Sequence, residues 1–175
     1  MSMMQELYLE LEDKQWPFQY VSHDRQIARA IVFDDAGFYF VRVQRDDDFG
    51  KACYIETAGG GVEPGEDLNK AILRELKEEL GAEAELICKI GVVSDYYNLI
   101  HRHNINHYFL CMVKSFGSKN LTQDEIDIYH LSTIRLSFDE AVAEYEKSAT
   151  QKVAQLVAAR ELPILHRAKE IIENL

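Results

Sequence analysis

The sequence has few of the residues that build disulfide scaffolds or linkers, because only three of its 175 residues are cysteine and three are proline. Cys53, Cys88 and Cys111 are widely spaced and form no C-x-x-C pair, which argues against a disulfide framework and against a cysteine-only zinc site. No internal repeat and no Pro-, Gly- or Ser-rich linker divides the chain. We therefore expect one domain spanning residues 1–175, in a reduced cytoplasmic setting.

Long apolar runs are also missing, and none approaches the roughly 20 residues that a helix needs to cross a bilayer. The first 13 residues are acidic, whereas a secretion signal begins with basic residues followed by an apolar stretch. These features predict a soluble cytoplasmic protein that has no membrane partner.

Positive charge is in short supply, since 19 lysines and arginines face 30 aspartates and glutamates, for a formal net charge of −11. A field of this sign repels nucleic acid and anionic lipid, so neither is an expected partner. A ligand that carries phosphate would need a local reversal of sign, and a bound cation is the simplest way to supply it. With 47% hydrophobic residues, the chain can still bury a sizeable core.

Hydrophobic patterning predicts a mixture of strands and helices. Residues 26–33 and 38–44 are rich in β-branched and aromatic side chains around a short turn, which is typical of a hairpin. Residues 67–80 predict a helix with Asp67 as N-cap and Gly81 at its end. The result is an α/β fold with a mixed, largely antiparallel sheet flanked by helices. Further strands are expected at 52–57, 84–94, 104–114 and 127–136, and further helices at 138–147, 151–159 and 163–174.

Three glutamates, Glu75, Glu78 and Glu79, fall on one side of the predicted helix, because residues three and four apart are neighbours there. Like charges at this spacing cost a helix about 0.2–0.5 kcal/mol per pair, and more beside a core. The apolar stripe of the same helix places these glutamates at the edge of the core. The residues alone leave two interpretations, a solvated acidic face offset by Arg74 or a cation site.

A run of three glycines, Gly59 to Gly61, precedes this helix. Consecutive glycines pack nothing and are useful where the backbone must turn sharply or approach a ligand closely. Hard cations take carboxylate, carbonyl and water oxygens, so a glycine carbonyl beside two or three glutamates would form a coherent site. A plain surface loop is the alternative interpretation of the glycines.

The segment from Gly60 to Ala82 resembles the Nudix box in residue type and in spacing. Only the last position departs from the pattern, because Ala82 stands where a bulkier aliphatic residue is usual, and this affects packing more than chemistry. The resemblance implies a Nudix-type α/β/α sandwich with C-terminal helices from about residue 138. The matching positions are Gly60, Glu66, Arg74, Glu75, Leu76, Glu78, Glu79 and Gly81.

The resemblance also implies roles for residues. Glu75, Glu78 and Glu79 would hold Mg²⁺ or Mn²⁺ with a carbonyl of Gly59 or Gly60, and Glu66 and Arg74 would orient those glutamates. Family members often add an acidic residue from a downstream loop. Glu125 is our candidate for it, with Asp124 or Asp127 as replacements, and Glu78 or Glu125 would act as general base.

The implied activity is metal-dependent hydrolysis of a phosphoanhydride bond in a nucleoside diphosphate linked to another moiety. The first alternative is a non-catalytic nucleotide-sensing module of the same fold, although such modules usually lose box glutamates that this chain keeps. A partner-binding protein with an incidental acidic helix and an isomerase acting on an isoprenoid diphosphate are further alternatives.

Substrate contacts are less clearly marked in the sequence. Arginines on or beside the N-terminal strands could bind phosphate, and nearby aromatic residues could stack on a base, although surface arginines and core aromatics are the ordinary interpretation. Apolar residues on the C-terminal helices could cover the sheet or form a homodimer. The main substrate candidates are Arg42, Arg45, Tyr54 and Tyr97, and the further candidates are Arg25, Arg29, Phe49 and Tyr96.

Overall fold

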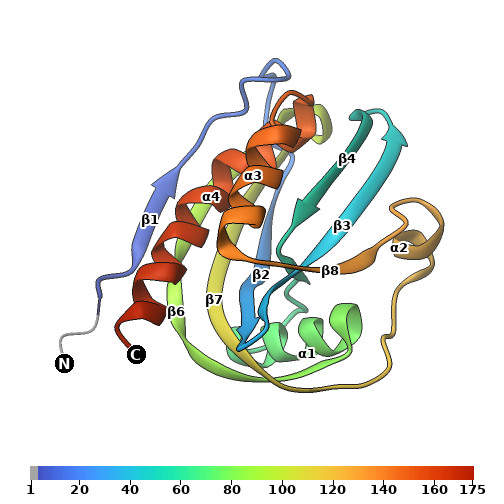
Figure 1. The fold of residues 1–175 in the computed structure, drawn as a ribbon. Coiled ribbons are helices and arrows are strands. Elements are labelled where there is room, and N and C mark those ends of the chain that lie inside the picture. The colour runs from blue at the N-terminus through green and yellow to red at the C-terminus, as the bar shows by residue number, and fades with distance from the viewer. Residues whose placement is uncertain (1–3) are drawn as a thin grey trace.

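A computed structural model describes residues 4–175 and shows a mixed sheet with helices packed on both faces (Figure 1). The sheet runs in the order β1-β6-β7-β2-β3-β4, with β5 added beside β2 and β8 beside β3. The expected α/β/α architecture is therefore confirmed. The strands are β1 (Leu7–Glu10), β2 (His23–Asp34), β3 (Gly37–Asp47), β4 (Gly50–Glu56), β5 (Ala58–Gly61), β6 (Ala82–Tyr97), β7 (Arg102–Phe116) and β8 (Ser132–Leu136), and the helices are α1 (Leu68–Leu80), α2 (Gln123–Asp127), α3 (Phe138–Ser148) and α4 (Lys152–Glu173).

Most strand pairs are antiparallel, as expected, but β2 pairs with β7 in parallel and β1 pairs with β6 in parallel. Side chains alternate across β7, so Tyr108 faces α4 and donates a hydrogen bond to Glu161 of that helix at 2.7 Å. Helix α1 packs mainly on β5 and β6, whereas α4 packs mainly on β4 and β6. The strand β5 and the helix α1 thus carry the sequence motif as one unit.

Helix α1 begins and ends where the sequence predicts. Asp67 occupies the N-cap position, although its side chain makes no capping hydrogen bond in the described structure. Gly81 ends the helix with φ 66°, and its N–H donates to the carbonyl oxygen of Lys77 at 3.0 Å. A side chain at Gly81 would collide with the carbonyl oxygen of Gly117, so both the backbone angle and the space require glycine here.

The prediction of two separate C-terminal helices, at 151–159 and 163–174, is wrong, because α4 continues through Pro163 without interruption. Proline removes one helical hydrogen bond and costs a helix interior about 3 kcal/mol. Both residues that follow it, Ile164 and Leu165, are fully buried in the core, and that packing outweighs the lost bond. The apolar side of α4 covers the sheet of its own chain.

Other differences concern short segments. The strand expected at 127–136 starts late, at Ser132, because residues 123–127 form the short helix α2 with a Thr122–Glu125 capping box. The glycine segment is not an open loop but the strand β5, which pairs with β2 so that Gly60 lies opposite Ala28. Within the described range, each helix is too short or too polar to span a membrane.

Candidate active site

The pairing of β5 with β2 and the packing of α1 against β5 bring the glycines and glutamates of the motif together. Glu75 lies directly over Gly60, and a Cβ atom at Gly60 would come within 2.7 Å of the Glu75 carboxylate. Any larger residue at position 60 would therefore displace this carboxylate. The glycine provides the close approach between backbone and acid that the sequence pattern indicates.

Arg74 ties together the acidic groups at the outer edge of this site. Its guanidinium donates to both carboxylate oxygens of Glu66, at 2.7 and 2.9 Å, and to the carbonyl oxygen of Gly61 at 3.2 Å. It also donates to Glu75 at 3.0 Å and to Glu78 at 3.2 Å. The hydrogen bonds from Arg74 lower the pKa of Glu66 to about 2. Arg74 thus fixes the orientation of three box glutamates, Glu66, Glu75 and Glu78.

Glu79 is the most enclosed carboxylate of the site, with 4% of its surface exposed. The N–H of Gly59 donates to it at 3.1 Å. Burial nevertheless raises the pKa of Glu79 well above its usual value, and the charge of Glu125 raises it further. Burial also raises the pKa of Glu75, with smaller contributions from Glu78 and Glu125.

Glu125 thus acts electrostatically on two glutamates of α1, although it lies far from α1 in sequence. Its own carboxylate accepts a hydrogen bond from the N–H of Thr122 at 2.8 Å, in the capping box of α2. The alternatives Asp124 and Asp127 are both exposed. Among the three downstream candidates, Glu125 is the one whose charge acts on Glu75 and Glu79.

The charge balance of this site suits a divalent cation. Arg74 is the base that pairs with Glu66, Glu75 and Glu78 within residues 4–175, and no ion pair in that range neutralises Glu79. No three acidic, histidine or cysteine side chains of these residues converge closely enough to form a complete metal cage. The three glutamates are held by different partners: Arg74 donates to Glu75 and Glu78, whereas the Gly59 amide donates to Glu79. Carboxylate and carbonyl oxygens are nevertheless the ligands that Mg²⁺ and Mn²⁺ prefer.

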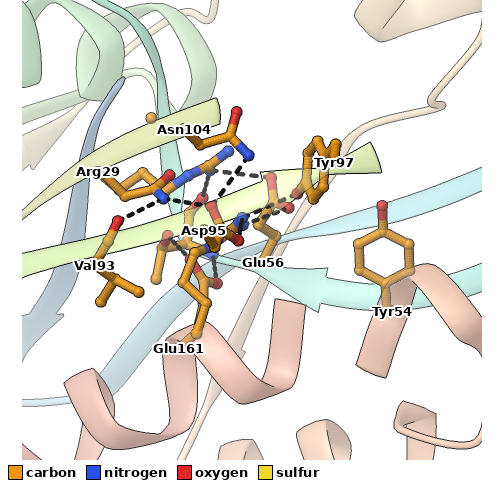
Figure 2. Close-up of polar contacts among 12 residues, drawn as sticks. Arg29, Tyr54, Glu56, Val93, Asp95, Tyr97, Asn104 and Glu161 are labelled. Atoms are coloured by element: carbon orange, nitrogen blue, oxygen red, sulfur yellow. Dashed lines mark hydrogen bonds and ion pairs between the residues drawn. The ribbon is translucent and has the colours of Figure 1, made fainter. Parts of the chain in front are cut away.

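Three of the four substrate candidates gather near the β3–β4 turn. Arg45 donates to the Tyr54 hydroxyl at 3.3 Å and lies 4.6 Å from the centre of the Phe49 ring. The Phe49 ring is in turn 5.7 Å from that of Tyr97, which faces the same region as Tyr54 in Figure 2. Asp47 forms an ion pair with Arg45 at 2.6 Å, so this arginine has little charge left for a phosphate.

Arg42 does not join this group, because its guanidinium approaches the sulfur of Cys53 at 3.8 Å. A surface hollow of about 670 Å³ lies beside Arg45, Cys53 and Asp127. None of the box glutamates is among its described lining residues, so the hollow is separate from the carboxylate site.

A buried polar network between the sheet and α4 was not foreseen from the sequence (Figure 2). Arg160 is completely buried and forms ion pairs with Asp95 at 3.2 Å and with Glu56 at 3.3 Å. Glu56 also pairs with Arg29 at 3.0 Å. The available signal was the charged pair Arg160-Glu161 in the middle of the apolar stripe of α4, where apolar residues are expected.

Glu161 completes this network as an acceptor. It receives hydrogen bonds from the N–H and hydroxyl of Thr57, at 2.7 and 2.6 Å, and from the hydroxyls of Tyr108 and Tyr145, at 2.7 and 2.9 Å. Buried charges are tolerated when they are paired and hydrogen-bonded, and each of these charges is paired, although Nε of Arg29 and Nε of Arg160 have no hydrogen-bond partner within residues 4–175. The network fixes α4 on the sheet immediately behind β4 and β5.

Comparison with known proteins supports the family suggested by the motif. The NUDIX domain family matches residues 23–157, while curated proteins give no match. Among solved structures, the MutT protein from Methanosarcina mazei Go1 is 15% identical with a TM-score of 0.61, over 88% of this chain and 97% of that one. A NUDIX hydrolase from Nitrosomonas europaea is 19% identical with a TM-score of 0.58, over 78% and 90% of the two chains. The described fold and the extent of the family match together show that the chain belongs to the Nudix hydrolase superfamily.

Proposed function

We propose that this protein hydrolyses a phosphoanhydride bond in a nucleoside diphosphate linked to another moiety, with Mg²⁺ or Mn²⁺ as cofactor. The observation that carries the proposal is the buried, incompletely neutralised carboxylate of Glu79 beside Glu75 and Glu125. Repelling carboxylates at the edge of a core are costly unless a cation joins them. The solved structure titled "ADP compounds hydrolase", which is 16% identical over 86% of this chain with a TM-score of 0.56, has a similar fold.

Glu75, Glu78 and Glu79 would hold the ion together with a carbonyl oxygen of Gly59 or Gly60. When bound, such an ion neutralises the diphosphate and makes a bound water more acidic. Arg74 and Glu66 act through the other glutamates, because the ion pairs of Arg74 determine where Glu75 and Glu78 point. Arg74 and Glu66 are positioning residues in this account.

A carboxylate must accept the proton of the attacking water, and Glu78 and Glu125 are the two candidates. Glu78 is half-buried and shares Arg74 with Glu75, so its position follows that arginine. Glu125 comes from a different element and acts on the glutamates of α1 through its charge. Separate glutamine variants at the two positions, assayed across pH, would show which one removes the fall in rate at low pH that protonation of a general base causes.

Turnover of a nucleotide panel tests the proposal. Nucleotide sugars, ADP-ribose, dinucleoside polyphosphates and nucleoside triphosphates would be incubated with Mg²⁺, with Mn²⁺ or with a chelator. We expect metal-dependent turnover that falls about 100-fold or more in Glu79→Gln with the fold unchanged, since a ligand of the cation is lost. The matched control is Glu85→Gln, an exposed acid that pairs with Lys114. Activity of Glu79→Gln within threefold of the parent would contradict the metal-ligand role, and binding without any turnover would favour the nucleotide-sensing alternative.

A further inference from the structure

Four arginines line the side of the sheet that faces α4: Arg25 and Arg29 on β2, Arg102 on β7 and Arg160 on α4. In the parallel pairing of β2 and β7, Arg25 lies opposite Asn104, and Arg102 lies two residues before Asn104 on the same face. Arg29 and Arg160 are neutralised by ion pairs with buried acids, as described above. The four side chains therefore divide into two pairs. Arg29 and Arg160 form the neutralised inner pair, and Arg25 and Arg102 form the outer pair.

The outer pair, Arg25 and Arg102, has no acidic ion-pair partner in the described part of the chain. Neither Arg25 nor Arg102 forms an ion pair with any residue between 4 and 175 for which the structure gives side-chain contacts. Arg102 donates through Nε to the side-chain oxygen of Asn104 at 2.6 Å, and its guanidinium lies 5.1 Å from the centre of the Tyr97 ring. These contacts use one donor and one face of the guanidinium, and they leave its remaining N–H groups available.

Glycine makes the room that Arg25 occupies. A Cβ atom at Gly61 would come within 2.9 Å of Nη2 of Arg25, so this side chain lies directly against the backbone of β5. The preceding residue, Gly60, makes the close contact with Glu75. One short strand thus separates the unpaired arginine from the box carboxylates, and the charge of Glu75 acts on Arg25.

The charges of Arg25 and Arg102 interact unfavourably, and neither group forms an ion pair within residues 4–175. Burial, followed by the charge of Arg25, lowers the pKa of Arg102 to about 10. Burial and the charge of Arg29 lower the pKa of Arg25. Both groups remain protonated at neutral pH, so an anionic ligand would relieve a repulsion that the protein maintains. The lack of ion pairs at these two arginines is not explained by a shortage of acidic residues, because the chain has a net charge of −11.

We propose that Arg25 and Arg102 bind a terminal phosphate of the substrate, on the side of β5 opposite Glu75. This inference rests on the proposed hydrolase function and narrows its substrate class. A terminal phosphate carries about −1.5 to −2 charges at pH 7, which two guanidinium groups match, whereas each phosphate of a diphosphate diester carries a single charge. Within the proposed class, the protein should therefore favour nucleoside triphosphates, in which the linked moiety is a terminal phosphate, over diesters such as ADP-ribose or nucleotide sugars.

The test uses Arg25→Gln and Arg102→Gln, with Arg135→Gln as matched control. Arg135 is an exposed arginine on β8, where it pairs with Tyr39 near the far end of the β2–β3 hairpin. We expect each test variant to bind inorganic pyrophosphate at least tenfold more weakly than the parent in metal-free buffer, as measured by calorimetry. In turnover assays, the ratio of KM for ATP to KM for ADP-ribose should rise at least tenfold. Arg135→Gln should change neither quantity.

A purely structural role for these arginines makes different predictions. It requires Arg25→Gln to lower the Tm, whereas removal of an unneutralised cation should leave the Tm unchanged or raise it. Pyrophosphate affinity within threefold of the parent in both variants would overturn the proposal, and so would equal KM increases for ATP and ADP-ribose. Because pyrophosphate binding is measured without metal or turnover, a failure of the hydrolase proposal would be seen separately, as an inactive enzyme that still binds the anion through these arginines.

Discussion

At the scale of single residues, the environment of each titratable group decides its charge. His107 on β7 is an example that lies outside the carboxylate site. Its Nε2 lies 2.7 Å from the side-chain oxygen of Gln26, and its Nδ1 lies 3.1 Å from Nζ of Lys89. An amide oxygen accepts and an ammonium donates, so both contacts suit a neutral ring with its proton on Nε2. Burial and the charge of Lys89 lower the pKa of His107 to about 4.

This neutral histidine predicts a loss of stability in mild acid. The unfolded chain takes up a proton near pH 6.5, but the folded chain does so only near pH 4, so the free energy of unfolding falls as pH decreases through that window. After allowance for solvent screening, we expect about 1 kcal/mol of this dependence at pH 5 to disappear in His107→Gln, as measured by urea denaturation at pH 5 and pH 7. The same pH dependence in parent and variant would contradict the assignment.

At the scale of elements, α4 shows how a helix can be fixed by charge as well as by packing. Arg160→Met removes the base that pairs with Glu56 and Asp95, so that within residues 4–175 the buried Asp95 loses its ion pair and Glu56 keeps only Arg29. Breaking a buried pair in this way costs about 3–5 kcal/mol, so we expect a loss of that size in the free energy of unfolding. Arg167→Met on the same helix is the control, since Arg167 forms a half-exposed pair with Glu170 that contributes at most about 1 kcal/mol. A loss below 1 kcal/mol for Arg160→Met would show that the network is dispensable.

Elements with long periodic patterns were predictable from the sequence, and short or context-dependent ones were not. The β2–β3 hairpin and α1 follow from strand alternation, a turn and a glycine stop, all of which are local signals. The four-residue strand β1 and the five-residue helix α2 are too short to show a period. Pro163 suggested a break in α4, because proline usually interrupts a helix. The helix continues because the residues next to Pro163 are buried, and that burial depends on tertiary packing that the sequence does not show.

The candidate site divides in the same way. The spacing of the box marked Glu75 and Glu79 as candidate metal ligands, because both residues lie on one helix and their spacing is a local feature of the sequence. Arg102 carried no comparable signal, because its lack of an acidic partner depends on the parallel pairing of β2 with β7. Arg160 meets Glu56 and Asp95 across separations of 104 and 65 residues, which no local pattern reveals.

At the scale of the whole molecule, the protein is acidic, and so is the substrate that we propose for it. A net charge of −11 repels phosphates at a distance, and two local features reverse that sign. One is the proposed cation at Glu75, Glu78 and Glu79, and the other is the unpaired arginine pair across β5. The family match and the fold make the first feature central, because the arginines only select among substrates that the cation site would process.

Direct titration with Mn²⁺ tests that central claim. The parent protein and a Glu75→Gln/Glu79→Gln double variant, checked for folding by circular dichroism, would be titrated while free Mn²⁺ is followed by electron paramagnetic resonance. We predict stoichiometric binding to the parent and at least tenfold weaker binding to the variant, because two carboxylate ligands are lost. Equal Mn²⁺ affinity in the two proteins, or no binding to the parent in the presence of nucleotide, would contradict it.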